Sequence, residues 1–279
     1  MMDMHIRRVG FLIIKTLFLA MILIFTIVPF VWVILSSFKT NDEILISSLS
    51  LPSKWTLDGY KRAFEMAPIP TFFRNSVIVS LSTTVLAISF FSMGAYVLAR
   101  MRGRFVRVIV AVLSMSLYIP VSALVQPVFL LVEGLGMYNH PSGLILVNIA
   151  MNLAISVFIL RATFLAIPIE IEESAYIDGA SVIRTFFSIV LPTAKSGQVT
   201  VGILCFINSW NQFMFPLVLT SQEESFTLPL ALNYFTAAFR FDYPALFAAL
   251  TITVLPTIIV FFLMSDRIIA GMAGGAIKG

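Results

Sequence analysis

The stretch GLILVNIAMNLAISVFILRATFLA, at residues 143–166, runs directly into IPIEIEESAYIDGASVIRTFFSIVLP, at residues 167–192. The first segment contains a single charged residue, Arg161. A helical apolar run of about 20 residues spans the hydrocarbon core of a bilayer. The second segment carries three glutamates near its start and is too polar to cross. Together the two segments predict a transmembrane helix that is followed by a structured loop outside the bilayer.

The composition of the whole chain agrees with this prediction. Of the 279 residues, 59% are hydrophobic and only 11% are charged, whereas ordinary globular proteins carry about 25% charged residues. So few charged residues cannot cover the apolar core of a soluble protein. The composition therefore excludes a cytosolic enzyme, a disordered chain and a nucleic-acid binder, and it indicates an integral membrane protein.

Six stretches are long and apolar enough to span a membrane as helices, so we predict an all-α polytopic membrane protein. The predicted spans are residues 11–35, 75–99, 105–132, 143–166, 197–219 and 244–264. The predicted organisation is an N-terminal tail with the first transmembrane helix (1–35), an external loop (36–74), a core of five transmembrane helices (75–266) that includes the loop 167–192, and a C-terminal tail (267–279).

Basic residues predict the orientation of these spans. With the N-terminus in the cytoplasm, 12 of the 18 Lys and Arg residues fall on the inner side and 6 on the outer side. The densest cluster, from Arg100 to Arg107, lies in a short loop, where the positive-inside rule carries most weight. We therefore expect a multi-pass protein of a bacterial or archaeal plasma membrane, with both termini cytoplasmic.

The predicted spans lack the groups that power transport or catalysis. No Asp, Glu or His lies in the middle of any span, although ion-coupled transporters place such groups there. The sequence has no phosphate-binding GxxxxGK motif, no metal-ligand cluster and no pairing of a nucleophile with a base. We therefore expect a non-catalytic chain that binds no cofactor and draws its energy from outside the membrane.

Neutral polar residues do occur in the spans. Such side chains can bond one helix to another, or they can line a pathway for an uncharged, hydroxyl-rich solute, and the sequence leaves both interpretations open. The candidate pathway residues are Ser122, Gln126, Asn148, Asn152, Asn208 and Asn211.

The loop 167–192 has the signals of a short helix–turn–helix. Pro168 suits a helix start, and the acidic residues after it complement the helix dipole. Gly179 can end this first helix and Ser181 can cap a second one. Ala175 and Gly179 are four residues apart on one face, so we predict a small-residue face that another protein can approach closely.

The spacing of this loop resembles a known family motif. Permease subunits of binding-protein-dependent ABC importers carry E-A-A, three residues, Gly, nine residues, then I-x-L-P. The chain has Glu173-Ser174-Ala175, then Gly179, then Ile189-x-Leu191-Pro192, with serine in place of the usual first alanine. The segment from Ile207 to Leu217 and the C-terminal GGAIKG resemble the carbohydrate-uptake branch, specifically its smaller maltose-type permease.

The resemblance implies the six-helix type I permease fold, with a coupling loop between helices 4 and 5 that binds an ATPase. It implies that the ATPase-coupling residues are Glu172, Glu173, Ser174, Ala175, Asp178, Gly179, Ala180, Ile189, Leu191 and Pro192.

The partners implied are a second, homologous permease subunit that completes a heterodimer, two cytoplasmic ATPases that use ATP–Mg, and an extracytoplasmic solute-binding protein. The external residues 221–243 resemble the segment that probes this binding protein. The implied function is half of an alternating-access pathway for a disaccharide or oligosaccharide. The alternatives are an ABC permease for another solute, such as a polyamine or phosphonate, and an ATP-independent carrier or channel.

Overall fold

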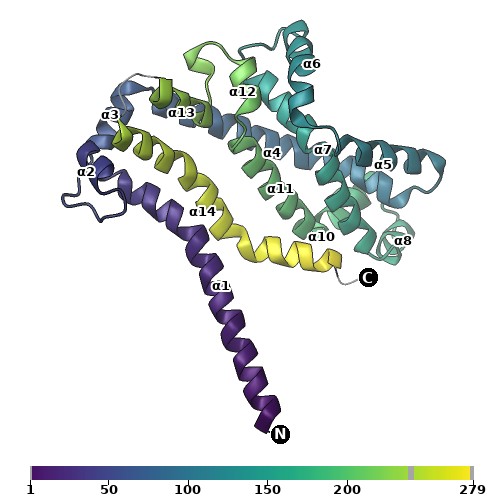
Figure 1. Cartoon of the computed structure of the whole chain (residues 1–279). Helices are drawn as coiled ribbons and strands as arrows, with labels where there is room; N and C mark the ends of the chain where they lie inside the picture. The colour runs from purple at the N-terminus through teal and green to yellow at the C-terminus, as the bar shows by residue number, and fades with distance from the viewer. Residues whose placement is uncertain (1, 238–241, 277–279) are drawn as a thin grey trace. The chain divides into compact units, whose positions relative to one another are not determined.

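The structure is a computed structural model that describes residues 2–237 and 242–276; the side chains of 2–10, 234, 236–237 and 265–276 also fall outside the description. Over this range every regular element is a helix, which confirms the all-α prediction (Figure 1). The elements in chain order are α1 (Met2–Ser36), α2 (Asn41–Ile46), α3 (Asp58–Met66), α4 (Ile69–Arg100), α5 (Arg104–Ser116), α6 (Val121–Gly134), α7 (Pro141–Ala166), α8 (Glu170–Ile177), α9 (Val182–Thr185), the π-helix η1 (Phe186–Val190), α10 (Leu191–Thr193), α11 (Lys195–Trp210), α12 (Met214–Leu219), the 3₁₀-helix η2 (Glu223–Ser225), α13 (Leu228–Ala237) and α14 (Tyr243–Ala276).

Four of the described helices are each long and apolar enough to cross a membrane, namely α1, α4, α7 and α14. Two further pairs pass the same test but are bent, so the number of spans reaches the predicted six if each bent pair is one span. The predicted third span, 105–132, is therefore not one straight helix. It consists of α5 and α6, which meet at an angle of 106°. Pro120 is the N-cap of α6 and adopts an extended conformation, and proline disfavours helical geometry in the residue before it.

The predicted fifth span, 197–219, is also interrupted. Its first part belongs to α11, which ends at Trp210, and its second part is the separate short helix α12. The segment Val182–Thr193 that leads into α11 meets it at 74°. Apolar composition predicts that residues 197–219 are in the membrane, but it does not report where the helix breaks.

The chain divides into two compact units. The first contains residues Met1–Ile69 and Leu232–Val254, and the second contains Pro70–Ala231 and Leu255–Gly279. In the first unit, every side chain from Phe11 to Val31 on α1 is exposed, and only the end of the helix packs within the unit, where Trp32 makes an edge-to-face contact with Phe247 at 5.0 Å. An apolar helix that is bare on all sides requires lipid or another protein chain around it.

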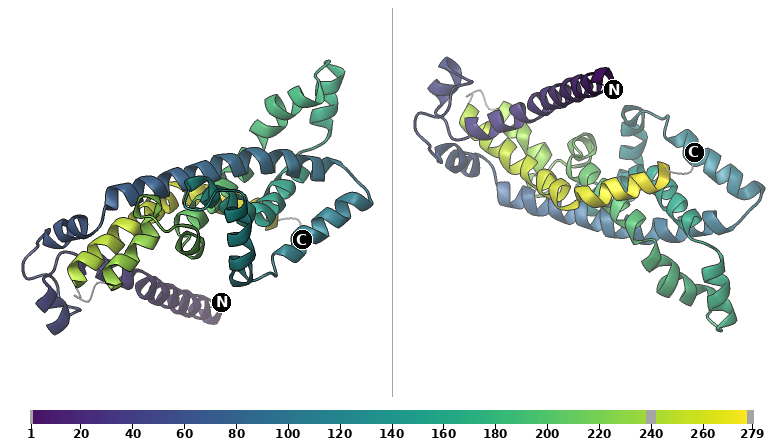
Figure 2. Two further views of the ribbon diagram at one scale, coloured as in Figure 1. Left: turned by 90° about the horizontal axis from the view of Figure 1, so that it is seen from above. Right: turned by 90° about the horizontal axis from the view of Figure 1, so that it is seen from below.

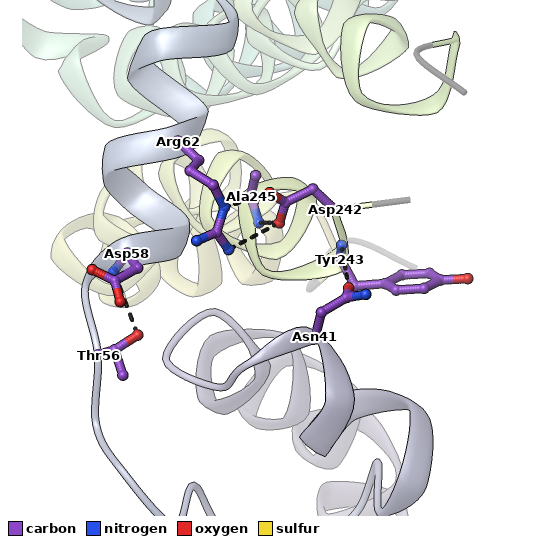
Figure 3. Close-up of polar contacts among 7 residues, drawn as sticks. All are labelled: Asn41, Thr56, Asp58, Arg62, Asp242, Tyr243 and Ala245. Atoms are coloured by element: carbon purple, nitrogen blue, oxygen red, sulfur yellow. Dashed lines mark hydrogen bonds and ion pairs between the residues drawn. The ribbon is translucent and has the colours of Figure 1, made fainter. Parts of the chain in front are cut away.

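Polar contacts close the first unit around its predicted external loop (Figure 3). Arg62 of α3 pairs with Asp242 through two nitrogens, and Asp242 also accepts the backbone N–H of Ala245 at 3.1 Å in the first turn of α14. The hydrogen bond to Asp242 raises the pKa of Arg62. Asn41 accepts the N–H of Tyr243 at 3.2 Å. These contacts tie α2 and α3 to the start of α14 around a polar pocket of about 360 Å³.

Glu43 organises the rest of this loop. Its carboxylate accepts the backbone N–H of Thr40 at 3.0 Å and that of Ser53 at 2.9 Å, and it also bonds the hydroxyl of Ser53. The hydrogen bond from the Ser53 hydroxyl is the main cause that lowers the pKa of Glu43 to about 2, and the backbone donors add to it. The ionised carboxylate of Glu43 therefore joins the two ends of the loop 40–53.

We predict that this arrangement weakens only in strong acid. A carboxylate whose pKa is lowered by folding stabilises the folded form above its unfolded pKa, and it loses that contribution as the pH falls through the folded value. Hydrogen exchange of the Thr40 and Ser53 amides, corrected for intrinsic rates, should stay slow from pH 7 to about 4.5 and should accelerate toward pH 2. In Glu43→Gln the exchange between pH 7 and about 4.5 should be faster than in the wild type and should show no such transition. A wild-type transition near pH 4.5 or above would contradict the assignment.

The second unit is built on α7 and α11, which pack antiparallel to each other. Asn208 Nδ2 donates to Asn152 Oδ1 at 2.9 Å, Ser156 and Cys205 lie 3.5 Å apart, and Gly197 faces Thr163. Small and neutral polar residues allow the two backbones to approach closely in a membrane.

Asparagines hold the predicted external end of the second unit. Asn139 has a left-handed backbone (φ 59°), and its side chain accepts the N–H groups of Ser221 and Gln222 at 3.0 Å each. Asn75 on α4 donates to the carbonyls of Glu224 and Phe226. The start of the predicted binding-protein segment is thus fixed in place. Of its later part, Phe235 is buried in α13, and residues 238–241 lie outside the described residues.

Candidate coupling loop and pathway residues

The loop 167–192 forms the predicted helix–turn–helix. Gly179 has φ +81°, its N–H bonds the carbonyl of Tyr176 at 3.0 Å, and the N–H of Ala180 bonds that of Ala175 at 2.9 Å. This pair of bonds is the Schellman arrangement that ends a helix. Ser181 then caps α9 by accepting the N–H of Arg184. Gly179 and Ser181 have the structural roles expected from the sequence. The motif projects away from α4 (Figure 2).

The return from this motif to α11 is irregular. Residues Phe186–Val190 form a π-helical turn, in which the N–H of Leu191 bonds the carbonyl of Phe186, five residues earlier. Pro192 then provides no N–H donor. Single π-turns interrupt helices where function or packing requires an extra residue.

The structure separates the ten predicted coupling residues by exposure. Those open to a partner are Glu173, Ser174, Asp178, Gly179 and Pro192; those partly covered are Ala180, Ile189 and Leu191; those buried are Glu172 and Ala175.

The prediction of an open small-residue face on α8 is wrong. Ala175 is only 6% exposed, whereas Gly179 is exposed. The chain reverses direction at Gly179, because the left-handed conformation of this glycine ends the helix. Gly179 therefore does not lie on the same helical face as Ala175. The surface that a partner can reach is therefore the turn and the Glu173 side of α8.

Glu172 faces the inside of the unit. It is 2% exposed, its Oε1 accepts Arg100 Nε at 2.7 Å, and its Oε2 accepts the hydroxyl of Tyr96 at 2.7 Å. Tyr96 and Arg100 are therefore members of this site that the sequence did not predict. The only signal in the sequence was the position of Arg100 at the end of a predicted span, which indicates orientation but names no partner for the side chain.

The candidate pathway residues fall into two sets. Asn148 and Asn152 are buried between helices, where Asn152 donates to the carbonyl of Asn148 at 2.8 Å and accepts from Asn208. Helix–helix bonding therefore accounts for Asn152 without a solute. Asn208 remains exposed despite this bond, and the other exposed candidates are Ser122, Gln126 and Asn211. Ser122 and Gln126 lie on a different helix from the asparagines, namely α6.

No group of three or more His, Cys, Asp or Glu side chains that could hold a metal ion occurs in the described part of the chain. That the chain binds no cofactor of its own stays a prediction.

Comparisons with known proteins identify the relatives of this chain. Residues 92–274 match the family described as binding-protein-dependent transport system inner membrane component. The chain is 36% identical to the diacetylchitobiose uptake system permease protein NgcG of Streptomyces coelicolor, over 91% of this chain and 85% of that protein. It is 31% identical to the trehalose transport system permease protein SugB of Mycobacterium tuberculosis, over 91% and 93% of the two chains. It is also 32% identical to the trehalose/maltose transport system permease protein MalG of Thermococcus litoralis, over 96% of each.

A solved structure shares the fold. It belongs to a bacterial ABC transporter involved in the import of the acidic polysaccharide alginate, and it superposes with a TM-score of 0.79 over 92% of this chain and 95% of that chain, at 22% identity. This similarity supports the predicted permease architecture and says nothing by itself about the solute. The family match covers more than half of the chain and the curated relatives cover nearly all of it, so this chain belongs to the inner membrane components of binding-protein-dependent transport systems.

Proposed function

We propose that the chain is one of two permease subunits in an ATP-driven importer of a disaccharide or oligosaccharide. It forms half of an alternating-access pathway and hydrolyses nothing itself. Separate ATPase subunits use ATP–Mg on the cytoplasmic side, and an extracytoplasmic binding protein delivers the solute. In this arrangement both termini are cytoplasmic.

The observation that carries the proposal is the exposed turn of the helix–turn–helix. Glu173, Asp178 and Gly179 lie on the outside of a loop whose base is built into the core of the second unit. An exposed acidic helix and turn offer a surface to a basic patch on another protein. A chain without a nucleotide site of its own needs such a surface to receive force from an ATPase.

The solute class is supported by two further observations. Relatives are named for diacetylchitobiose, trehalose and maltose transport. The exposed neutral side chains of Ser122, Gln126, Asn208 and Asn211 can exchange hydrogen bonds with hydroxyl groups and present no charge that would require an ionic solute.

A second permease subunit is supported by the bare surface of α1. All its side chains from Phe11 to Val31 are exposed, so this apolar surface is free to pack against another membrane chain. The family description itself names a component of a larger transport system.

The test is transport by the assembled system in proteoliposomes. The chain is reconstituted with its partner permease, ATPase and binding protein, and uptake of labelled mono-, di- and trisaccharides is measured with and without ATP. We expect ATP-dependent uptake of a di- or trisaccharide that requires the binding protein. Uptake of the solute by this chain alone, without ATP, would overturn the proposal in favour of a carrier or channel, and ATP-driven uptake of a non-sugar solute alone would overturn the assigned solute class.

A further inference from the structure

Glu172 differs from its neighbours in the first turn of α8. Glu170 and Glu173 are exposed, whereas Glu172 is 2% exposed. Burying a carboxylate is strongly unfavourable unless it is paired and hydrogen-bonded. A loop whose task is to meet another protein has no need of such a residue on its inner side, so this burial requires an explanation.

Both oxygens of Glu172 are bound by the last turn of α4. Arg100 reaches Oε1 with Nε at 2.7 Å and with Nη2 at 2.6 Å, and Tyr96 donates its hydroxyl to Oε2 at 2.7 Å. Arg100 Nη2 also donates to the carbonyl of Ile167, at 3.1 Å, in the segment before α8. The end of α4 therefore holds both α8 and the chain that enters it.

The same turn of α4 contacts the other arm of the motif. The ring of Tyr96 lies 4.9 Å from that of Phe186, in the π-turn that follows α9, and 5.8 Å from that of Phe164 near the end of α7. Arg161 of α7 donates to the carbonyl of Leu98 on α4 at 3.0 Å. The base of the helix–turn–helix is thus fixed to α4 by charge, hydrogen bonds and ring packing at once.

We infer that Glu172, Arg100 and Tyr96 form the joint through which displacement of the loop 167–192 moves α4. Glu172 is a positioning residue in this joint: it contacts no ATPase and acts by holding α8 to α4, whereas the exposed turn receives the force. The inference rests on the proposed function, because a joint has a role only in a chain that is driven through this loop.

The ion pair is suited to this task. Both oxygens of Glu172 are engaged, because two nitrogens of Arg100 converge on Oε1 and Tyr96 donates to Oε2. Because the side chain of Arg100 is 16% exposed and that of Glu172 is 3% exposed, little water competes for the pair. A shift of α8 therefore cannot be absorbed locally by exchange of these bonds for bonds to water.

The first test measures solute moved per ATP hydrolysed by the complete complex in proteoliposomes. Glu172→Gln and Arg100→Gln should lower this ratio about tenfold while the subunits still assemble and hydrolyse ATP. Arg100→Lys keeps the positive charge but not the planar guanidinium group, so the ratio should fall less in this variant. Glu170→Gln, in the same turn but exposed, should retain the wild-type ratio. If uptake and hydrolysis fall together in Glu172→Gln, so that the ratio is unchanged, the residue has only a structural role and the inference is overturned.

The second test measures the joint directly. Spin labels at Val97→Cys on α4 and Glu170→Cys on α8 are both on exposed positions, and the native Cys205 is fully buried. In the assembled complex the distribution of distances between the two labels should be narrow, and its mean should be the same with and without nucleotide. Adding the Glu172→Gln substitution should broaden this distribution. A wild-type distance that changes with nucleotide would overturn the inference.

The proposed function and the joint fail in different ways. If the wild-type complex couples no sugar uptake to ATP, the proposed function is wrong whatever the variants do. If it does couple them and Glu172→Gln behaves as wild type, only the joint is wrong. The spin-label measurement does not depend on the identity of the solute.

Discussion

Gly179→Val is expected to abolish ATP-driven uptake while leaving membrane insertion unchanged. Gly179 has φ +81°, and a β-branched residue in the left-handed region costs about 1–2 kcal/mol or more. The valine would distort the Schellman turn and place a branched side chain on the surface that we assign to the ATPase. Uptake and ATPase binding by the purified complex measure the effect.

Two controls separate the causes. Asparagine tolerates the left-handed region better than other non-glycine residues, so Gly179→Asn should fold the turn correctly and retain more uptake than Gly179→Val. Gly136 also has a positive φ (68°), and like Gly179 it has open space where a Cβ would lie. Because Gly136 is in the connection between α6 and α7, Gly136→Val should carry similar backbone strain without blocking uptake. If Gly136→Val and Gly179→Val were equally inactive, backbone strain rather than the position of Gly179 would be the cause.

Gly197→Leu is expected to prevent stable packing of α7 against α11. A Cβ at Gly197 would clash with Thr163 Oγ1 and would lie 2.8 Å from the Cβ of Thr163. Thr163 is β-branched, and its hydroxyl already bonds the carbonyl of Ile159 at 2.9 Å, so it cannot easily turn away. Even Gly197→Ala should lose about 1–3 kcal/mol through overpacking, and leucine should lose more. Thermal unfolding in detergent, followed by size-exclusion chromatography, measures the loss.

Gly94 on α4 is the matched control for this prediction. It is exposed and helical, and nothing lies within 4 Å of the position that a Cβ would occupy. Gly94→Ala should therefore leave stability unchanged or raise it by about 0.5–1 kcal/mol, since alanine favours helix more than glycine does. Thr163→Ala should restore part of the stability lost in Gly197→Ala. If Gly197→Leu unfolded at the same temperature as the wild type, α7 and α11 would not meet at this point.

Much of the fold follows from patterns that are local in the sequence. Apolar length alone predicts the long helices α1, α4, α7 and α14. The helix–turn–helix was also predictable, because Gly179 and Ser181 act through hydrogen bonds to residues within five positions of them. Helix ends of this kind depend on the chain only a few residues away.

The features that could not be predicted depend on distant partners. Three glutamates in one helical turn look equivalent in sequence, and only the approach of Arg100, 72 residues away, makes Glu172 the buried one. The bend between α5 and α6 is different, because its signal, Pro120, is local. For Asn152 the sequence left two interpretations open, and its contact with Asn208 across 56 positions supplies a structural reason for its burial.

The bond between α4 and α8 has a thermodynamic consequence. Coupling free energy between two sites is reciprocal, so a rigid attachment that lets nucleotide state bias the membrane helices must also let the membrane helices bias nucleotide affinity. In the proposed complex, solute arriving at one face of the bilayer then changes how tightly ATP is held at the other, and the contact between Glu172 and Arg100 contributes to both effects.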